Sequence, residues 1–274
     1  MEEHQIKIRL FADHCIICRK ILNIKDVEKL HTDLDRLGDW AERNEIKINP
    51  SKSKALSFTR AHVKDLLNYS LGDQKIPEAS CCKYLGIIIG SDLSWADQVK
   101  CTVQKAWRAL HFVMRIVKKG TKNTKSLAYA SLVRPILEYG AACWDPYREC
   151  QISALYRVQN KAAKFAHHSG GSDWESLAQR RKIARMCAFY KAYTGERAWK
   201  AIGDGLQAPS YLSRVVRYWK IRARKQRTDI GKYSFVNRSL ADWNQLSEGA
   251  IGTSHGKTHI FKTSVRKVKT SKGK

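Results

Sequence analysis

Acidic residues are scarce in this sequence. Against 51 Lys and Arg residues there are 25 Asp and Glu, which gives a formal net charge of +26. Such a charge lies far outside the range of a typical soluble domain. The commonest partner of a strongly basic surface is a polyanion, and nucleic acid is the first candidate. A basic protein without such a partner is the alternative, because an excess of charge alone does not prove binding.

Long apolar runs are also absent. No stretch approaches the run of about 18 apolar residues that spans a bilayer. The first residues, Met1 to His4, have neither the basic start nor the apolar stretch of a secretory signal. We therefore expect no membrane partner and an intracellular location, with nucleus and cytoplasm both open.

The cysteines form no recognisable framework. The chain has 8 of them, scattered and without a secretory context, so reduced thiols are expected. Cys15 and Cys18 make one CxxC pair without a second pair of ligands, and Cys143 and Cys150 near His167 match no common zinc finger. There is also no glycine-rich phosphate loop and no internal repeat. These absences exclude the commonest disulfide, zinc-finger and P-loop classes.

Two short runs with strand character surround the tetrapeptide FADH. From Ile6 to Leu10, apolar and basic residues alternate with the strand period of two, and Cys15 to Ile17 form a short apolar return strand. This pattern predicts a β-hairpin with Asp13 at its tip and His14 beside it.

The region after this hairpin shows mixed periodicity. Apolar residues from Ile24 to Arg43 recur at steps of three and four after Asn23, which predicts an amphipathic helix packed on the sheet that carries Asp13. A hairpin-like unit is expected around Asn49-Pro50-Ser51, and a small strand pair around Gly72-Asp73. Residues 83–89 read as one buried strand.

Helices are expected in the remainder of the chain. Ser94 is a plausible N-cap for a helix that runs to Met114. Apolar stripes predict further helices over 123–139, 152–167 and 174–193, which together suggest a helical bundle. From Gly249 the composition predicts a flexible basic tail, with Phe261 available to dock back.

Basic side chains on the predicted helices define one candidate nucleic-acid surface. A charged helix face is often only solvated, but here the excess has one sign, so phosphate contacts without base reading are favoured. The residues expected to form this positive track are Arg108, Arg115, Lys118, Lys119, Arg157, Lys161 and Lys164.

Two further basic groups are candidates. Lys52 and Lys54 either face a phosphate or an incoming nucleotide, or are solvated turn residues. The densest basic run combines cations with an aromatic ring that suits stacking on the bases of a single strand or hybrid. Its members are Arg214, Arg217, Trp219, Arg222, Arg224, Lys225 and Arg227.

The sequence LFADHCII resembles the FADD box in the palm of reverse transcriptases from non-LTR (LINE-type, jockey-like) retrotransposons. Family-like segments follow in the expected order. They are Lys83 to Ile87 with Asp92 to Trp95, Leu132 to Tyr139 through Trp144 to Tyr147, Val158 to Ala163, Ser234-Phe235, and Asp242 to Leu246. This order identifies the chain as similar to the C-terminal part of such an enzyme.

The resemblance implies an α+β fold in three parts. Residues 1–92 correspond to the remnant of an antiparallel palm, 93–200 to a helical thumb, and 201–274 to a basic C-terminal region with a flexible tail. It also implies an RNA-directed DNA polymerase that uses Mg²⁺, with nucleic acid (RNA, DNA or a hybrid) as its partner.

Two departures from the family pattern bear on activity. The family takes one metal-binding Asp from the FADD box and another from an earlier strand, whereas this chain begins a few residues before the box. His14 stands at the second Asp of the box, and imidazole is a poor substitute for the oxygen ligands that Mg²⁺ prefers. Asp13 is therefore the expected ligand of an incomplete Mg²⁺ site at which no ion binds productively.

Three functional hypotheses remain open at this point. The first is a catalytically inactive polymerase fragment that still binds nucleic acid. The second is a non-enzymatic basic binding module, and the third is a subunit that completes a polymerase with a separate upstream fragment. Whether Met1 is a true start, and whether RNA or DNA is preferred, is not evident from the sequence.

Overall fold

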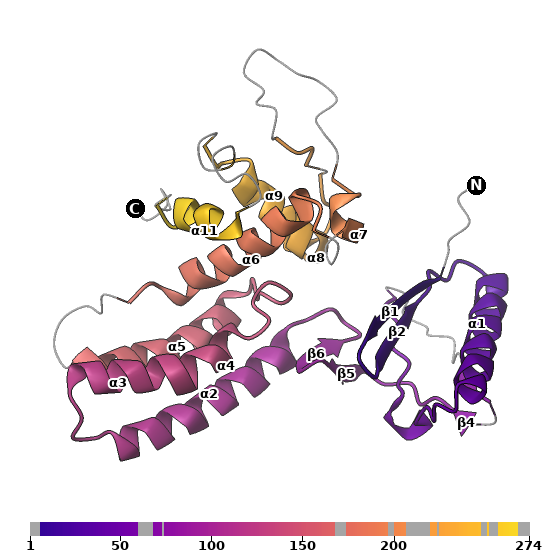
Figure 1. The fold of residues 1–274 in the computed structure, drawn as a ribbon, viewed down its shortest axis with the longest axis horizontal. Helices are drawn as coiled ribbons and strands as arrows, with labels where there is room; N and C mark the ends of the chain where they lie inside the picture. The colour runs from indigo at the N-terminus through magenta and orange to yellow at the C-terminus, as the bar shows by residue number, and fades with distance from the viewer. Residues whose placement is uncertain are drawn as a thin grey trace, which may run out of the picture. The chain divides into compact units, whose positions relative to one another are not determined.

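The chain forms two compact units, residues 1–94 and 95–274. The computed structural model describes residues 6–59, 68–72, 74–167, 174–196, 200–206, 220–223, 225–247, 251 and 257–267. Within these residues the first unit combines helix with small antiparallel sheets, and the second contains helices without strands (Figure 1). The expected α+β class is therefore confirmed at this level.

The first unit begins with the predicted hairpin. Strands β1 (Lys7–Phe11) and β2 (His14–Cys18) pair antiparallel, with Phe11 opposite His14. Ala12 and Asp13 form the turn, and Ala12 has a φ of 50°, in the left-handed region that two-residue hairpin turns require. Among the described strands, only β2 pairs with β1.

Helix α1 (Ile24–Arg43) has the predicted bounds. The Asn23 side chain accepts a hydrogen bond of 3.1 Å from the Asp26 N–H, so the N-cap is the expected one. Val27 and Leu34 of the helix form a small core with Tyr69 and Ile76. The helix therefore buries the middle of the predicted apolar face, whereas Ile24 and Trp40 near its ends are 67% and 50% exposed.

The strand pair expected around Gly72 is present and covers this helix. It consists of β3 (Ser70–Leu71) and β4 (Gln74–Lys75). Ile17 of β2 packs against the same core from the partly buried side of the hairpin. The predicted packing of α1 on the sheet that carries Asp13 thus holds through Ile17, with β3 as a second contact.

The hairpin expected around Asn49-Pro50-Ser51 is wrong. The segment forms a single 3-10 turn, η1 (Pro50–Lys52), in which the Asn49 side chain accepts a hydrogen bond from the Ser51 N–H at 3.0 Å. The chain beyond it does not return alongside its entry. Ala55 instead makes an isolated parallel bridge with Glu78, so the partner lies further along the sequence.

The single buried strand expected over residues 83–89 is also wrong. Two strands, β5 (Cys81–Tyr84) and β6 (Ile87–Gly90), form a hairpin here. Leu85 and Gly86 have φ values of 45° and 82°, both in the left-handed region. Glycine populates that region at no steric cost, so Gly86 was the available signal for a turn.

The second unit begins with α2 (Ala96–Ile116), whose N-cap is Trp95 and not the expected Ser94. The helix expected over 123–139 is interrupted: α3 (Lys122–Ala128) is followed by the π-helical turn η2 (Tyr129–Val133) and then by α4 (Arg134–Glu138). Pro135 has no N–H to donate, so a regular α-helical ladder cannot continue through it.

The later helices start at positions other than expected. α5 (Glu149–His167) begins before residue 152, and α6 (Leu177–Tyr193) begins after residue 174 with Ser176 as its N-cap. The short helices α7 (Lys200–Gly203) and α8 (Asp229–Lys232) and the longer α9 (Phe235–Trp243) follow. In Figure 1, α6 lies between the α4–α5 layer and the helices α9 and α11 (Thr258–Lys267).

The flexible tail expected from Gly249 is wrong for its described part. Residues Thr258–Lys267 form helix α11, which packs along α6. Phe261 does dock back as predicted: its side chain is fully buried and stacks on Tyr190 with 4.3 Å between ring centroids. Met186 and Trp243 complete this part of the core.

Candidate functional site

Asp13 lies at the exposed tip of the hairpin. Its Oδ1 is 2.9 Å from Nδ1 of His14, and 89% of the Asp13 side chain is exposed. The hydrogen bond from His14 is the main cause of a lowered pKa of the Asp13 carboxyl, and the charge of Lys52 contributes in the same direction. The His14 ring also meets Tyr84 edge-on, with 6.0 Å between centroids. The structure therefore brings together Asp13 and His14, and the charge of Lys52 acts on Asp13 only weakly.

These residues do not make a two-metal site. Among the described residues, no group of three or more His, Cys, Asp and Glu side chains is placed to hold a metal ion. Two other carboxylates of this unit are already engaged: Asp33 pairs with Arg19 at 3.0 Å, and Asp92 accepts a hydrogen bond from the Ser94 N–H at 2.9 Å. Magnesium chemistry of the family type needs several oxygen ligands, and this donor set does not fit it.

The cysteines and the helices bear on the other expectations. None of the eight cysteines is joined in a disulfide in this structure. None of the helices in the described part of the chain combines the length and apolar content that crossing a bilayer requires.

The predicted basic track appears as two stripes, one on each of two helices. Arg108 and Arg115 lie two turns apart on α2, opposite its buried face, and Arg157, Lys161 and Lys164 recur on successive turns of α5. All five side chains are exposed. Because α2 and α5 pack together, each stripe points away from the helix interface, so the two stripes occupy outward faces.

The remaining basic candidates fall into three groups. Lys118 and Lys119 are exposed just after α2, Lys54 is exposed after η1, and Arg222, Lys225 and Arg227 are exposed in the segment before α8. That segment is held at Ile221, whose N–H donates to Asn244 Oδ1 at 3.1 Å. The predictions for Arg214, Arg217, Trp219 and Arg224 lie outside the described residues.

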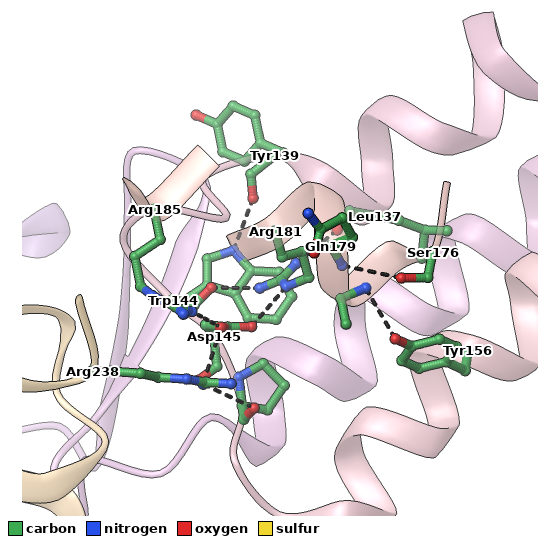
Figure 2. Close-up of polar contacts among 12 residues, drawn as sticks. Leu137, Tyr139, Trp144, Asp145, Tyr156, Ser176, Gln179, Arg181, Arg185 and Arg238 are labelled. Carbon is green, nitrogen blue, oxygen red and sulfur yellow. Dashed lines mark hydrogen bonds and ion pairs between the residues drawn. The ribbon is translucent and has the colours of Figure 1, made fainter. Parts of the chain in front are cut away.

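A network of buried arginines and carboxylates in the second unit was not predicted. Asp145 pairs with Arg181 Nε at 2.9 Å, with Arg185 Nη1 at 2.5 Å and with Arg238 Nη1 at 3.0 Å. Figure 2 shows these three guanidinium groups converging on Asp145 from different directions. One carboxylate thereby joins the segment before α5 to helices α6 and α9.

A second carboxylate extends this network, and a third forms a separate pair of ion pairs beside it. Asp242 binds Arg185 Nη2 at 2.6 Å and Lys182 Nζ at 2.9 Å. Glu138 binds Arg134 at 2.9 Å and also accepts from Arg180. The three carboxylates thus come from α4, from α9 and from the segment between α4 and α5.

Arg181 is the most enclosed member of the network. Its Nη1 donates to the Leu137 carbonyl at 2.8 Å and its Nη2 to the Trp144 carbonyl at 2.5 Å, while its guanidinium lies 4.1 Å from the Trp144 ring centroid. Burial lowers the pKa of Arg181 and of Arg238, because desolvation disfavours the charged form. The attraction of Asp145 opposes that effect for both arginines.

The excess of basic over acidic residues was the sequence signal for this network. The chain has 51 Lys and Arg residues and 25 Asp and Glu residues, so each carboxylate in the basic half of the chain has many possible partners. Glu138, Asp145 and Asp242 also lie in the segments that carry the family resemblance. Their burial depends on α6 being covered on two sides, which periodicity does not reveal.

Comparison with known proteins identifies three relatives. The chain is 26% identical over 168 residues to a "Probable RNA-directed DNA polymerase from transposon X-element" of Drosophila melanogaster, a match that covers 60% of this chain and 18% of that protein. It is 24% identical over 135 residues to a "Probable RNA-directed DNA polymerase from transposon BS" of the same organism, covering 48% and 15%.

The third relative is the "RNA-directed DNA polymerase from mobile element jockey" of Drosophila funebris, 20% identical over 179 residues, covering 64% of this chain and 19% of that protein. The matches therefore span less than a fifth of each relative. No family model matches, and no solved structure matches. The three similarities confirm the resemblance: over about half its length, this chain is similar to the RNA-directed DNA polymerases of non-LTR retrotransposons.

Proposed function

We propose that this chain is a reverse-transcriptase-related fragment that binds nucleic acid through its helical unit and does not polymerise DNA by itself. In family terms the β1–β2 hairpin is part of a palm, and the helices from α2 onward are a thumb. The observation that carries the proposal is the contrast between a single exposed carboxylate at Asp13 and two exposed basic stripes on α2 and α5.

The absence of polymerase activity follows from the ligand set. Two-metal nucleotidyl transfer needs carboxylates that hold both ions so that one activates the attacking hydroxyl. Asp13 has an imidazole as its immediate neighbour at 2.9 Å, and a neutral nitrogen ligand suits Mg²⁺ poorly. Asp13 can contribute one oxygen ligand to an ion, but it cannot complete the coordination shell of that ion.

Primer extension with the purified chain tests this part. We expect no template-dependent incorporation with Mg²⁺ or Mn²⁺, and none after His14→Asp, because one added carboxylate does not replace a ligand from another strand. Incorporation by the unmodified chain that Asp13→Asn abolishes would overturn the proposal.

Nucleic-acid binding follows from the exposed stripes. Lysine and arginine side chains that neutralise phosphates release condensed counterions, so affinity falls with salt in proportion to the number of contacts. The stripe on α5 repeats at the spacing of helical turns and lies opposite the buried residues Leu155, Val158 and Ala162. This arrangement suits backbone contacts without base reading.

Anisotropy titrations across a salt series test the binding proposal. Replacing Arg157, Lys161 and Lys164 with Gln should lower the slope of log K against log salt by about 0.9 for each lost contact on duplex DNA and about 0.7 on a single strand. A matched control replaces Lys25, Lys47 and Lys75, which are exposed in the first unit, with Gln. An equal decrease of the salt slope in both triple variants would show that only net charge matters and would contradict a specific surface.

A second candidate function is supported by the apolar exposure of β1. Leu10 is 70% exposed and Phe11 is 62% exposed, and the other edge of β1 has no strand partner among the described residues. Such an edge is a template for another strand. The alternative is therefore a subunit that completes a polymerase with a separate upstream fragment. Primer extension that appears only when the upstream fragment is added to this chain would favour it.

A further inference from the structure

The buried arginine network borders a cavity in the helical unit. The cavity has a volume of about 280 Å³ and lies among the Asp145–Pro146 segment and helices α5, α6 and α9. The lining has a basic wall from α6 and α9, which includes Lys182, Arg185 and Arg238, and an apolar wall from α5, which includes Ile152 and Leu155. Neither the metal site nor the exposed basic stripes account for it.

The charges that line this cavity do not balance. Four cationic side chains (Arg181, Lys182, Arg185 and Arg238) face two carboxylates (Asp145 and Asp242), which leaves a formal charge of +2. Both carboxylates are already fully used: three guanidinium groups bind Asp145, and one guanidinium and one ammonium bind Asp242. A partly enclosed excess of positive charge is costly unless an anion compensates it.

Hydrogen-bond donors on the basic wall are also unused. Arg185 Nε is buried without an acceptor among the described residues, although the side chain is only 5% exposed. Arg238 makes all of its contacts to the described residues through Nη1. A buried donor without a partner costs free energy that a bound acceptor would recover.

We propose that this cavity binds a phosphate group carried by a nucleotide. Guanidinium forks match the geometry of phosphate oxygens and bind them with charge-assisted hydrogen bonds. The unused donors of Arg238 and the ammonium of Lys182 supply contacts on the basic wall. The apolar wall at Ile152 and Leu155 gives the rest of a nucleotide a surface on which to pack.

The phosphate could come from two sources, a free nucleotide or the terminus of a nucleic-acid strand. Both present the same dianionic group. The site is distinct from the exposed stripes on α2 and α5, so loss of strand binding along those stripes leaves this inference standing.

The test is a phosphate titration of the full chain at constant ionic strength, with chloride as the balancing anion and thermal stability as the readout. We expect saturable stabilisation by inorganic phosphate. Lys182→Gln should weaken the apparent affinity at least tenfold, whereas Lys262→Gln, at an exposed lysine of α11 outside both basic stripes, should leave it unchanged. Equal affinity in wild type and Lys182→Gln, or no saturable effect, would overturn the proposal.

A measurement on the unmodified chain covers the case in which a variant fails to fold. Inorganic phosphate should protect Lys182 from an amine-reactive label, read by mass spectrometry, and should not protect Lys262, an exposed lysine of α11. Unchanged labelling of Lys182 at saturating phosphate would contradict the site.

The source of the phosphate is resolved with two further probes. A nucleoside 5′-monophosphate and a pair of oligonucleotides, with 5′-phosphate and with 5′-hydroxyl ends, are titrated in the same way. Tighter binding of the 5′-phosphorylated oligonucleotide than of the 5′-hydroxyl oligonucleotide assigns the site to strand ends. Saturable binding of the mononucleotide, with no difference between the two oligonucleotides, assigns it to free nucleotide. Failure of every phosphate-bearing probe to bind would overturn the proposal.

Discussion

The two units of this chain differ in how completely they bury their apolar residues. In the helical unit Trp243 and Phe261 are 0% exposed, whereas the core of the first unit consists of residues such as Val27 and Leu34 that are each 8% exposed. Single apolar side chains are exposed in both units, such as Leu10 at 70% on β1 and Ile116 at 69% at the end of α2. The helices of the second unit enclose a fully buried core, whereas the hairpin of the first unit does not. We therefore expect the hairpin to be the region where another protein surface would pack.

The units differ in the same way in their use of charge. Asp13 and His14 meet at the surface, where water screens their interaction. Asp145 is 14% exposed and is held by three arginines. A carboxylate in the helical unit is therefore a structural centre, while the carboxylate at the hairpin tip contributes little to folding.

The largest expected effect comes from removing that centre. Asp145→Asn leaves Arg181, Arg185 and Arg238 without their shared counter-charge, and breaking one partner of a buried ion pair costs about 3 to 5 kcal/mol. Urea denaturation followed by tryptophan fluorescence measures it. Glu149→Gln makes the same chemical change at an exposed position and should cost little; equal effects in both variants would remove the distinction between centre and surface.

A large effect is also expected for the docked C-terminal helix. Phe261→Ala removes a fully buried ring that stacks on Tyr190. We expect a loss of about 3 kcal/mol, the lower end of the range for such substitutions, because a peripheral helix can partly collapse into the space. The same denaturation assay applies. A change below about 0.5 kcal/mol, typical of surface sites, would show that α11 is not part of the core.

Helix caps offer a comparison of intermediate size. Asn23→Ala removes the side-chain acceptor at the start of α1, and Thr121→Ala removes the equivalent acceptor at the start of α3. Each should cost about 1 kcal/mol. Because the first unit has the smaller core, hydrogen exchange should accelerate more widely after Asn23→Ala than after Thr121→Ala. Local changes of the same extent in both helices would indicate that the two units are equally stable.

The smallest stability change is expected on β1. Phe11→Ser alters a side chain that is 62% exposed, so the free energy of unfolding of the protein should change by less than about 0.5 kcal/mol. The variant should nevertheless associate less, because an exposed apolar strand edge promotes pairing between chains. Light scattering over a concentration series measures this. Strong destabilisation with unchanged association would show that β1 is covered and would break the comparison between the units.

Several elements follow from local sequence alone. The alternation from Ile6 to Leu10 predicted β1, and the spacing of apolar residues after Asn23 predicted both ends of α1. These features depend on side chains within a few residues of one another, since the strand and helix periods are local properties of the backbone. The exposed basic residues on α2 and α5 were predicted for the same reason: one face of each helix is apolar, which leaves the other face to the solvent.

Other elements depended on partners that lie far away in the sequence. Ala55 pairs with Glu78 instead of with the segment before η1, and α11 forms against α6, although the composition of the tail predicted flexibility. In both cases the contact that stabilises the segment comes from residues that a local window does not include, so propensity was overridden by packing.

The arginine network shows the boundary between the two kinds of information most clearly. The sequence by itself determined that α6 is a basic helix with an apolar stripe, and that this chain resembles a family of RNA-directed DNA polymerases. Only the tertiary structure decided that Arg181 and Arg185 are buried, because α4 covers one side of α6 while α9 and α11 cover another. Once a helix is enclosed in this way, its charged side chains can no longer be solvated and must find carboxylates, which here come from Asp145 and Asp242.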